Sequence, residues 1–414
     1  MQKLIIFALV LSFMVFSLPQ WASADQSASP DKRMASEYIS EGMYEDFEKN
    51  AEAVSASAEI AEPEVPASSA VLAEVSTGRI LYSKNADESR SPASITKIMT
   101  LLLVMESIDS GSLSLTDKVT ASPHACSMGG SQIWLEPGET MTVDELLKAV
   151  AVASANDAAV ALGEHIAGSE EAFVSMMNTR AKELSMTGTH FENACGLDTD
   201  GHVSTATDVA KMSCELLKHD LIKNYSCIWM DYLRDGKTQL VNTNKLVRFY
   251  EGATGLKTGT TDKAGYCVAA SAEKNGMELV AVILDGETSD KRFSGAKTLL
   301  NYGFSRWEVA TKQIDATAIQ DVTVTHGAKE SVEVNFTSEV SFLVSKGRGQ
   351  DIAVKITLPQ DVEAPVAAGQ LLGKVSFTLD DEVIGESQLL AASAVEKLTL
   401  GGALAKLLRS VFSI

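Results

Sequence analysis

Ser94-Ile95-Thr96-Lys97 is the first of three short motifs in this chain, and Ser154-Ala155-Asn156 and Lys257-Thr258-Gly259 follow it in that order. In this order the motifs supply a nucleophilic hydroxyl, a base, a proton relay and a cation for an anionic group. Each motif alone is weak evidence, because such short patterns recur by chance. Ser-x-x-Lys also occurs at Ser29/Lys32, Ser271/Lys274 and Ser294/Lys297. The ordered set therefore carries the inference, and it indicates an acyl-transfer enzyme.

Ser94 and Lys97 lie three positions apart, so in a helix their side chains share one face about one turn apart. A hydroxyl is a poor nucleophile until a base accepts its proton, and a lysine can do so when desolvation lowers its pKa. Ile95 and Ile98 offer apolar surroundings, and Pro92 indicates that Ser94 begins a helix, where backbone N–H groups favour developing negative charge. The alternative is an N-capped helix with an exposed lysine.

Ser154-Ala155-Asn156, with Asp157, interrupts the apolar run 150–162. Buried polar groups cost free energy unless they have partners, so we expect a loop that points Ser154 and Asn156 into a cleft. There Ser154 would relay a proton to the leaving group, and Asn156 would hold Lys97 and a substrate amide. The alternative is a helix N-cap with Asp157 in its first turn.

Lys257-Thr258-Gly259 follows two glycines, Gly252 and Gly255, which allow close approach to the backbone. A cation and a hydroxyl on a strand edge suit a terminal carboxylate. We expect Gly259 to leave room for substrate beside the strand, and the N–H groups of Thr260 and Ser94 to share the oxyanion. The alternative is a surface turn with an incidental lysine.

Composition narrows the classes of function. The chain has 414 residues, is 45% hydrophobic and has a net charge of −20, which favours a globular protein and argues against a nucleic-acid partner. The chain has no Gly-x-Ser-x-Gly elbow, so a Ser-His-Asp hydrolase lacks its usual signature. The six histidines have no His-Glu-x-x-His spacing and suit surface or packing roles, with His202 a candidate for the border of the cleft.

The cysteines follow no Cys-x-x-Cys pattern, so neither a metal site nor a cofactor is expected. Five are present: Cys126, Cys195, Cys214, Cys227 and Cys267. Buried free thiols are the favoured interpretation, and one pair among the middle three stays open.

The chain divides into five predicted segments. Residues 1–24 read as a cleaved signal peptide, with a membrane-anchoring helix as the alternative, and 25–66 as an acidic linker. We expect a catalytic domain over 67–310, a β-rich domain over 311–391 and an amphipathic helix over 392–414. The last helix places Leu400, Leu404, Leu407, Leu408 and Val411 on one face. It would either lie in a membrane interface or dock on its own domain.

Hydrophobic periodicity places the main elements of the catalytic domain. We expect a hairpin over 70–84, helices over 97–106, 143–166 and 293–304, and strands over 266–272 and 278–284 joined at Lys274-Asn275-Gly276. Short β-like runs between 314 and 390 predict a separate β-sandwich.

The surroundings of the motifs resemble one known family. The matching stretches are 90–100, Leu135-Glu136-Pro137-Gly138-Glu139, 154–158, Gly196-Leu197-Asp198 and 255–259. They are similar to those of low-molecular-mass penicillin-binding proteins, which are serine D-alanyl-D-alanine carboxypeptidases, over about residues 66–310. Two positions depart from the usual pattern, Ala155 where glycine is frequent and Thr260 where bulkier residues often occur.

The resemblance implies an α/β (α+β) penicillin-recognising serine transpeptidase/β-lactamase-like domain, with an antiparallel sheet and a helical lobe, before a small β-sandwich. It also implies that Ser94 attacks the bond between the terminal D-alanines of peptidoglycan stem pentapeptides and that the acyl-enzyme is then hydrolysed. β-Lactams would acylate Ser94. We further expect an exported protein, peripheral on the outer face of the cytoplasmic membrane or in the cell wall.

Three other functions stay open. A D,D-endopeptidase would share this chemistry. A β-lactamase would need a device for deacylation such as Glu-x-x-Leu-Asn or Tyr-x-Asn, and the chain contains neither. A non-catalytic peptidoglycan-binding module should have lost Ser94, Lys97 or Lys257, and all three are present.

Overall fold

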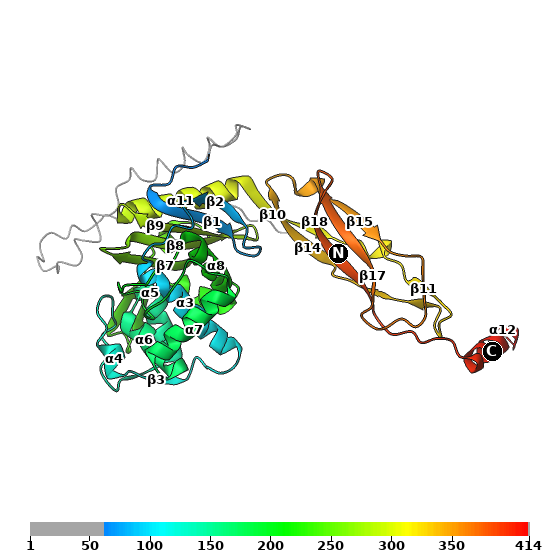
Figure 1. The fold of residues 1–414 in the computed structure, drawn as a ribbon, viewed down its shortest axis with the longest axis horizontal. Helices are drawn as coiled ribbons and strands as arrows, with labels where there is room; N and C mark the ends of the chain where they lie inside the picture. The colour runs from blue at the N-terminus through cyan, green and yellow to red at the C-terminus, as the bar shows by residue number, and fades with distance from the viewer. Residues whose placement is uncertain (1–61, 413–414) are drawn as a thin grey trace, which may run out of the picture. The chain divides into compact units, whose positions relative to one another are not determined.

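The computed structural model describes residues 62–412, with side-chain exposure as far as 407 (Figure 1). The expected signal peptide at 1–24 and residues 25–61 of the expected linker lie outside the described residues.

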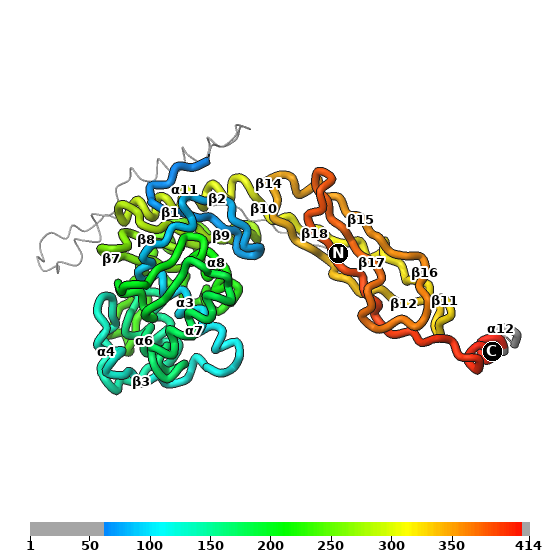
Figure 2. Tube along the Cα trace, in the orientation of Figure 1, coloured from blue at the N-terminus to red at the C-terminus, as the bar shows by residue number. Residues whose placement is uncertain are grey.

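A five-stranded antiparallel sheet organises the catalytic region, in the order β2-β1-β9-β8-β7. Its strands are β1 (Ala67–Glu74), β2 (Ile80–Lys84), β7 (Ala253–Thr261), β8 (Gly265–Lys274) and β9 (Met277–Gly286). Figure 2 labels these five strands on the Cα trace. The sheet thus joins the start of the domain to the strand that carries the third motif.

Local chemistry explains the two hairpins that the sequence predicted. The carboxylate of Glu74 accepts the backbone N–H groups and hydroxyls of Ser76 and Thr77, which closes the β1–β2 turn. The β8–β9 turn has positive φ at both Asn275 (51°) and Gly276 (75°), the conformation that an Asn-Gly hairpin turn favours. Both predicted hairpins are present.

Helices cover both faces of the sheet, so the inner strands β1, β9 and β8 are largely buried on both sides, whereas the edge strand β2 is partly exposed (Figure 1). In β1, Val71 and Ala73 pack with the helical lobe, whereas Ala70 and Leu72 pack with α11 (Ser289–Arg306). The lobe contains α3 (Lys97–Asp109), α5 (Val143–Ala153), α6 (Asn156–Ala167), α7 (Glu170–Glu183) and α8 (Ala206–Leu217).

The apolar run predicted as one helical stretch, 143–166, forms two helices. A capping box between Thr142 and Glu145 begins α5. Ser154 ends it in the left-handed conformation (φ 62°, ψ 30°), and α6 begins at Asn156. The interruption falls at the polar motif, as its polar residues indicated.

Short elements complete this region. They are η1 (Ala93–Thr96), β3 (Lys118–Thr120), α4 (Pro123–Cys126), β4 (Thr140–Thr142), η2 (Asp220–Ile222), α9 (Lys223–Ser226), β5 (Met230–Leu233), β6 (Thr238–Val241) and α10 (Leu246–Phe249).

A β-rich domain follows, with separate small sheets ordered β10-β14, β12-β11-β16 and β13-β18-β17-β15. Val375, Phe377 and Leu389 lie at the centre of one of its two apolar clusters. Its strands are β10 (Trp307–Gln313), β11 (Val322–Thr325), β12 (Ser331–Val332), β13 (Val334–Asn335), β14 (Glu339–Ser345), β15 (Ala353–Thr357), β16 (Asp361–Glu363), β17 (Leu371–Leu379) and β18 (Glu382–Ala391), with 3₁₀ turns η3 (Ala316–Ala318) and η4 (Gly349–Asp351). This confirms the β-rich second domain.

The last described element is α12 (Leu400–Phe412), on which Leu400, Leu404 and Leu407 are 93%, 60% and 62% exposed. Within residues 62–412, no helix is both long enough and apolar enough to cross a membrane. All five cysteines are free thiols, so the disulfide that the sequence left open does not form.

Candidate active site

The nucleophile motif lies in a 3₁₀ turn, η1, directly before α3. In a 3₁₀ turn the side chains at i and i+3 eclipse one another, which is a closer alignment than in an α-helix. Accordingly, Lys97 Nζ lies 2.9 Å from Ser94 Oγ. The sequence predicted this pair, and the structure brings its two atoms within hydrogen-bond distance.

The Lys97 amine is fully buried and has three oxygen neighbours: Ser94 Oγ, Asn156 Oδ1 at 2.5 Å and the carbonyl of Cys195 at 2.7 Å. Burial lowers the pKa of Lys97 to about 8, although Cys195 and Asp157 oppose the shift. A neutral amine has two hydrogens and one lone pair. Because Asn156 Oδ1 and the Cys195 carbonyl only accept, they take the two hydrogens and leave the lone pair for the Ser94 hydroxyl.

The second motif fastens a neighbouring loop while presenting Asn156 to Lys97. Asn156 donates from Nδ2 to the carbonyl of Gly129 (2.6 Å), and its backbone N–H donates to Ser131 (2.7 Å). The buried carboxylate of Asp157 accepts the N–H groups of Ile133 and Leu135, at 3.2 and 3.0 Å. These contacts supply the partners that the buried polar groups require.

Ser154 is only 4% exposed, and its left-handed backbone sets it at the junction of α5 and α6. Among the described residues its hydroxyl has no recorded hydrogen-bond partner, so its proton-relay role stays a prediction.

The third motif lies on β7, where the Lys257 side chain is buried. Its amine has one recorded hydrogen bond within residues 62–412, to the carbonyl of Thr258 at 3.2 Å. Burial, with Lys97 and Arg292 nearby, holds the pKa of Lys257 well below its ordinary value. The Thr258 hydroxyl donates to that of Thr243 (2.8 Å). A desolvated amine with so few acceptors is suited to an incoming anion.

Two glycines allow β7 and a loop to approach the nucleophile turn. A Cβ on Gly259 would lie 2.9 Å from the carbonyl oxygen of Pro92 and 3.1 Å from the backbone N of Ile95. A Cβ on Gly196 would lie 1.9 Å from the carbonyl oxygen of Ala93. Gly259 therefore has a packing requirement in addition to the room for substrate that the sequence predicted.

Sequence reasoning missed Arg292, which reaches the site from α11. Its Nη1 donates to Thr260 Oγ1 at 2.9 Å and to the carbonyls of Gly259 and Cys267 at 3.2 Å each. Its Nε is buried without a hydrogen-bond partner among the described residues, and burial lowers the pKa of the guanidinium. No local pattern could have assigned it, because it lies 33 positions from Gly259 on a helix across the sheet.

Sequence reasoning also missed the roles of the loop that contains Gly196-Leu197-Asp198. Cys195 supplies a carbonyl to Lys97. Asp198 Oδ1 accepts the hydroxyls of Ser91 and Thr261, both at 3.0 Å, and so ties the loop to both flanking motifs. The stretch was recognised as part of the resemblance, but its contacts depend on the tertiary fold.

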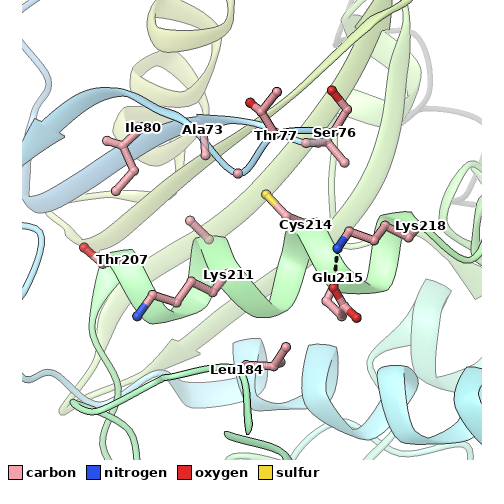
Figure 3. A pocket seen from close by; sticks show the side chains of 13 residues that line it. Ala73, Ser76, Thr77, Ile80, Leu184, Thr207, Lys211, Cys214, Glu215 and Lys218 are labelled. Carbon is pink, nitrogen blue, oxygen red and sulfur yellow. Dashed lines mark hydrogen bonds and ion pairs between the residues drawn. The ribbon is translucent and has the colours of Figure 1, made fainter. Parts of the chain in front are cut away.

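A separate cavity of about 260 Å³ lies between the β1–β2 turn and α8, and contains none of the motif residues (Figure 3). Its lysines already have carboxylate partners: Lys218 lies 2.6 Å from Glu215, and Lys211 lies 3.0 Å from Asp208. The catalytic groups thus converge elsewhere, where η1, the α5–α6 junction and β7 meet.

Comparisons with known proteins find similar sequences over most of the chain. A family model described as D-alanyl-D-alanine carboxypeptidase (peptidase S11) matches residues 55–288, and one for the C-terminal domain of penicillin-binding protein 5 matches residues 312–397. D-alanyl-D-alanine carboxypeptidase DacF of Bacillus subtilis is 44% identical over 335 residues, covering 80% of this chain and 86% of that protein. DacC of Escherichia coli is 34% identical over 344 residues, covering 81% and 86%.

Solved structures show the same similarity. Penicillin-binding protein 5 of Haemophilus influenzae matches 82% of this chain and 100% of its own, with a TM-score of 0.69 and 30% identity. Penicillin-binding protein D2 of Listeria monocytogenes, in a cefotaxime-bound form, matches 59% of this chain and 99% of its own, with a TM-score of 0.54 and 35% identity.

Proposed function

The chain belongs to the peptidase S11 family of serine-type D-alanyl-D-alanine carboxypeptidases, and we propose that it removes the terminal D-alanine from peptidoglycan stem pentapeptides through an acyl-enzyme on Ser94. The observation that carries the proposal is the Lys97 amine. It is buried, 2.9 Å from Ser94 Oγ, and has acceptors for both of its hydrogens in a neutral state.

Acylation begins when Ser94 Oγ attacks the carbonyl carbon of the penultimate D-alanine while its proton passes to Lys97 Nζ. The tetrahedral oxyanion accepts hydrogen bonds from the backbone N–H groups of Ser94 and Thr260. The C–N bond then breaks, and Ser154 relays a proton from Lys97 to the departing amine. D-Alanine leaves with that proton, and an ester remains on Ser94.

Deacylation reverses the same roles with water as the nucleophile. Lys97 Nζ accepts a proton from the attacking water, the ester C–O bond breaks, and the proton returns to Ser94 Oγ. The products are a stem tetrapeptide with a free carboxylate and the regenerated hydroxyl.

The terminal carboxylate of the substrate binds to the groups on β7. Lys257 is a buried amine, Thr258 supplies a hydroxyl, and Arg292 adds a second cation beside Thr260. The Oδ1 of Asn156 accepts from Lys97 and its Nδ2 donates to Gly129, so only its second amide hydrogen would be left for the peptide backbone of the substrate. A substrate that ends in a carboxylate therefore matches the charge of the site.

β-Lactams would acylate the same serine, because a strained cyclic amide presents a carbonyl and a nearby carboxylate to these groups. Support comes from two structures of Listeria monocytogenes penicillin-binding protein D2, described as cefotaxime-bound and ampicillin-bound, which are 35% and 34% identical to this chain.

The proteins of this family are extracytoplasmic, and we place this one on the outer face of the cytoplasmic membrane or in the cell wall. The supporting feature is the exposed apolar face of α12, which includes Leu400 and Leu404. Such a face binds a membrane surface by burying apolar area in the interface.

Mass spectrometry of the mature protein tests the proposal. Incubation with penicillin should add one acyl group to the peptide that contains Ser94, and incubation with a stem pentapeptide should release one D-alanine per turnover. An adduct on another residue, or cleavage only between cross-linked stems, would reject the assignment.

A further inference from the structure

His202 is a buried titratable residue to which the reaction steps above assign no role. Its side chain is 2% exposed, and its ring lies against Phe191 with the centroids 5.8 Å apart and the planes at 67°. Nε2 lies 2.7 Å from the hydroxyl of Thr96, and Nδ1 accepts the backbone N–H of Glu192 at 3.0 Å. The imidazole thus bridges the nucleophile motif and the loop over residues 190–204.

The bond from Glu192 fixes the tautomer of the ring. Because Nδ1 accepts an N–H, its lone pair is used there, and the hydrogen of the neutral ring lies on Nε2. Nε2 therefore donates to Thr96 Oγ1. Burial is the main cause that lowers the pKa of His202 to about 4; His190 and Lys263 contribute to this shift, and Asp198 opposes it. The ring is neutral wherever the enzyme has a neutral Lys97.

Thr96 and the loop each touch the catalytic pair. Thr96 lies between Ser94 and Lys97 in the 3₁₀ turn, so its position constrains both side chains. The loop contains Cys195, whose carbonyl accepts one hydrogen of the Lys97 amine. A second bond, from Thr100 Oγ1 to the carbonyl of Ala194 at 2.6 Å, fastens the same loop to the next turn of α3.

Two hydrogen bonds to α3 and the turn before it, those of His202 with Thr96 and of Thr100 with the Ala194 carbonyl, lie on either side of the contact between Lys97 and the Cys195 carbonyl. Asp198 separately ties the loop to Ser91 and Thr261, so loss of the His202 contact would loosen the segment from Glu192 to Cys195 and not the whole loop. The amine could then turn away from Cys195 and present a hydrogen, instead of its lone pair, to the Ser94 hydroxyl.

We propose that His202 is a positioning residue for acylation, which holds Thr96 and the Cys195 loop together so that the Lys97 lone pair faces Ser94. The inference rests on the proposed function, since it requires Ser94 as the nucleophile. The ring bonds to Thr96 and Glu192, and to neither Ser94 nor Lys97.

Penicillin acylation tests this with two matched substitutions. His202→Phe keeps the ring packing against Phe191 and removes both hydrogen bonds, whereas His202→Gln keeps an N–H donor and an acceptor. Saturation kinetics separate the Kd of the non-covalent complex from the first-order acylation rate constant. We expect His202→Phe to slow acylation about 10- to 100-fold with Kd unchanged, and His202→Gln to stay within about threefold of wild type.

Thr96→Val removes Thr96 Oγ1, the partner of His202 Nε2. This variant tests the same hydrogen bond if His202→Phe does not fold. It should slow acylation similarly, and the double variant should be no slower than either single variant, because one shared interaction is lost. The inference would be overturned if His202→Phe or Thr96→Val kept the wild-type acylation rate constant. It would also be overturned if His202→Gln were acylated as slowly as His202→Phe. A wild-type enzyme that forms no adduct on Ser94 would instead reject the proposed function, and this inference with it.

Discussion

At the scale of single residues, two buried lysines lie in one site, and their different hydrogen-bond partners indicate different roles. Lys97 contacts three oxygens, two of which can only accept hydrogens. Lys257 has a single recorded contact within the described residues, the carbonyl of Thr258. Lys97 is therefore arranged as a base, and Lys257 as an amine whose protonated form would be stabilised by the anionic group of a bound substrate.

Replacing the nucleophile gives the first prediction. Ser94→Ala should abolish both D-alanine release and covalent penicillin labelling, because no other hydroxyl of residues 62–412 is bonded to the Lys97 amine. Ser294→Ala is the matched control: it changes another Ser-x-x-Lys serine, which is exposed on α11, and should leave both unchanged. Labelling that persists in Ser94→Ala would assign the nucleophile elsewhere.

Lys257 gives the second prediction. Lys257→Ala should lower kcat/KM for a pentapeptide with a free terminal carboxylate on the order of 10- to 100-fold, because a charge-assisted hydrogen bond is lost. For the C-terminally amidated peptide, kcat/KM should fall much less. Lys263→Ala, an exposed lysine after the same strand, serves as control. Equal losses for both peptides would remove the carboxylate-binding role.

At the scale of elements, the site depends on how closely β7 approaches the turn η1. Gly259 faces the backbone of Pro92 and Ile95, which cannot move without moving the nucleophile. Gly259→Ala should therefore destabilise the protein by about 1–3 kcal/mol through overpacking and should also slow acylation of the folded fraction.

Thermal unfolding and active-site titration check this prediction together. Gly401→Ala is the control, since a Cβ there meets no atom within 4 Å, and its unfolding temperature should match wild type. A Gly259→Ala enzyme with normal stability and normal acylation would show that the close approach is dispensable.

The sequence predicts elements well where a local pattern dictates them. The Asn275-Gly276 turn and the helix after Lys97 follow from turn chemistry and periodicity, and both are present. The 3₁₀ turn at Ser94 has no such signal. Neither do the contacts of Arg292 and the Cys195 carbonyl, because each joins segments that only the tertiary fold brings together. The motif residues, including Asn156, could thus be found from the sequence, but Arg292 and the Cys195 carbonyl could not.

At the scale of the whole molecule, a catalytic domain and a β-rich domain precede a helix with an exposed apolar face. Net charge is −20, so electrostatic attraction to anionic lipid is not the expected source of membrane binding. The apolar side chains of α12 are the better candidates, since the free energy of interfacial binding grows with the apolar area buried.

Vesicle co-sedimentation tests this anchoring. Leu404→Glu should release the protein from phosphatidylglycerol–phosphatidylethanolamine vesicles without changing carboxypeptidase activity in solution. Leu371→Glu, at another leucine that is 60% exposed but lies on β17, should not affect binding. If Leu404→Glu still sediments with vesicles, α12 is not the anchor.

The pH dependence of penicillin acylation tests the central claim, that the neutral Lys97 amine activates Ser94. Burial lowers the pKa of Lys97 to about 8, and only the deprotonated form can accept the serine proton. The acylation rate constant should therefore rise about tenfold per pH unit below that pKa and level off above it, and Lys97→Met should form no adduct. A rate constant that stays flat from about pH 6 to about pH 9, or an adduct at wild-type rate in Lys97→Met, would contradict it.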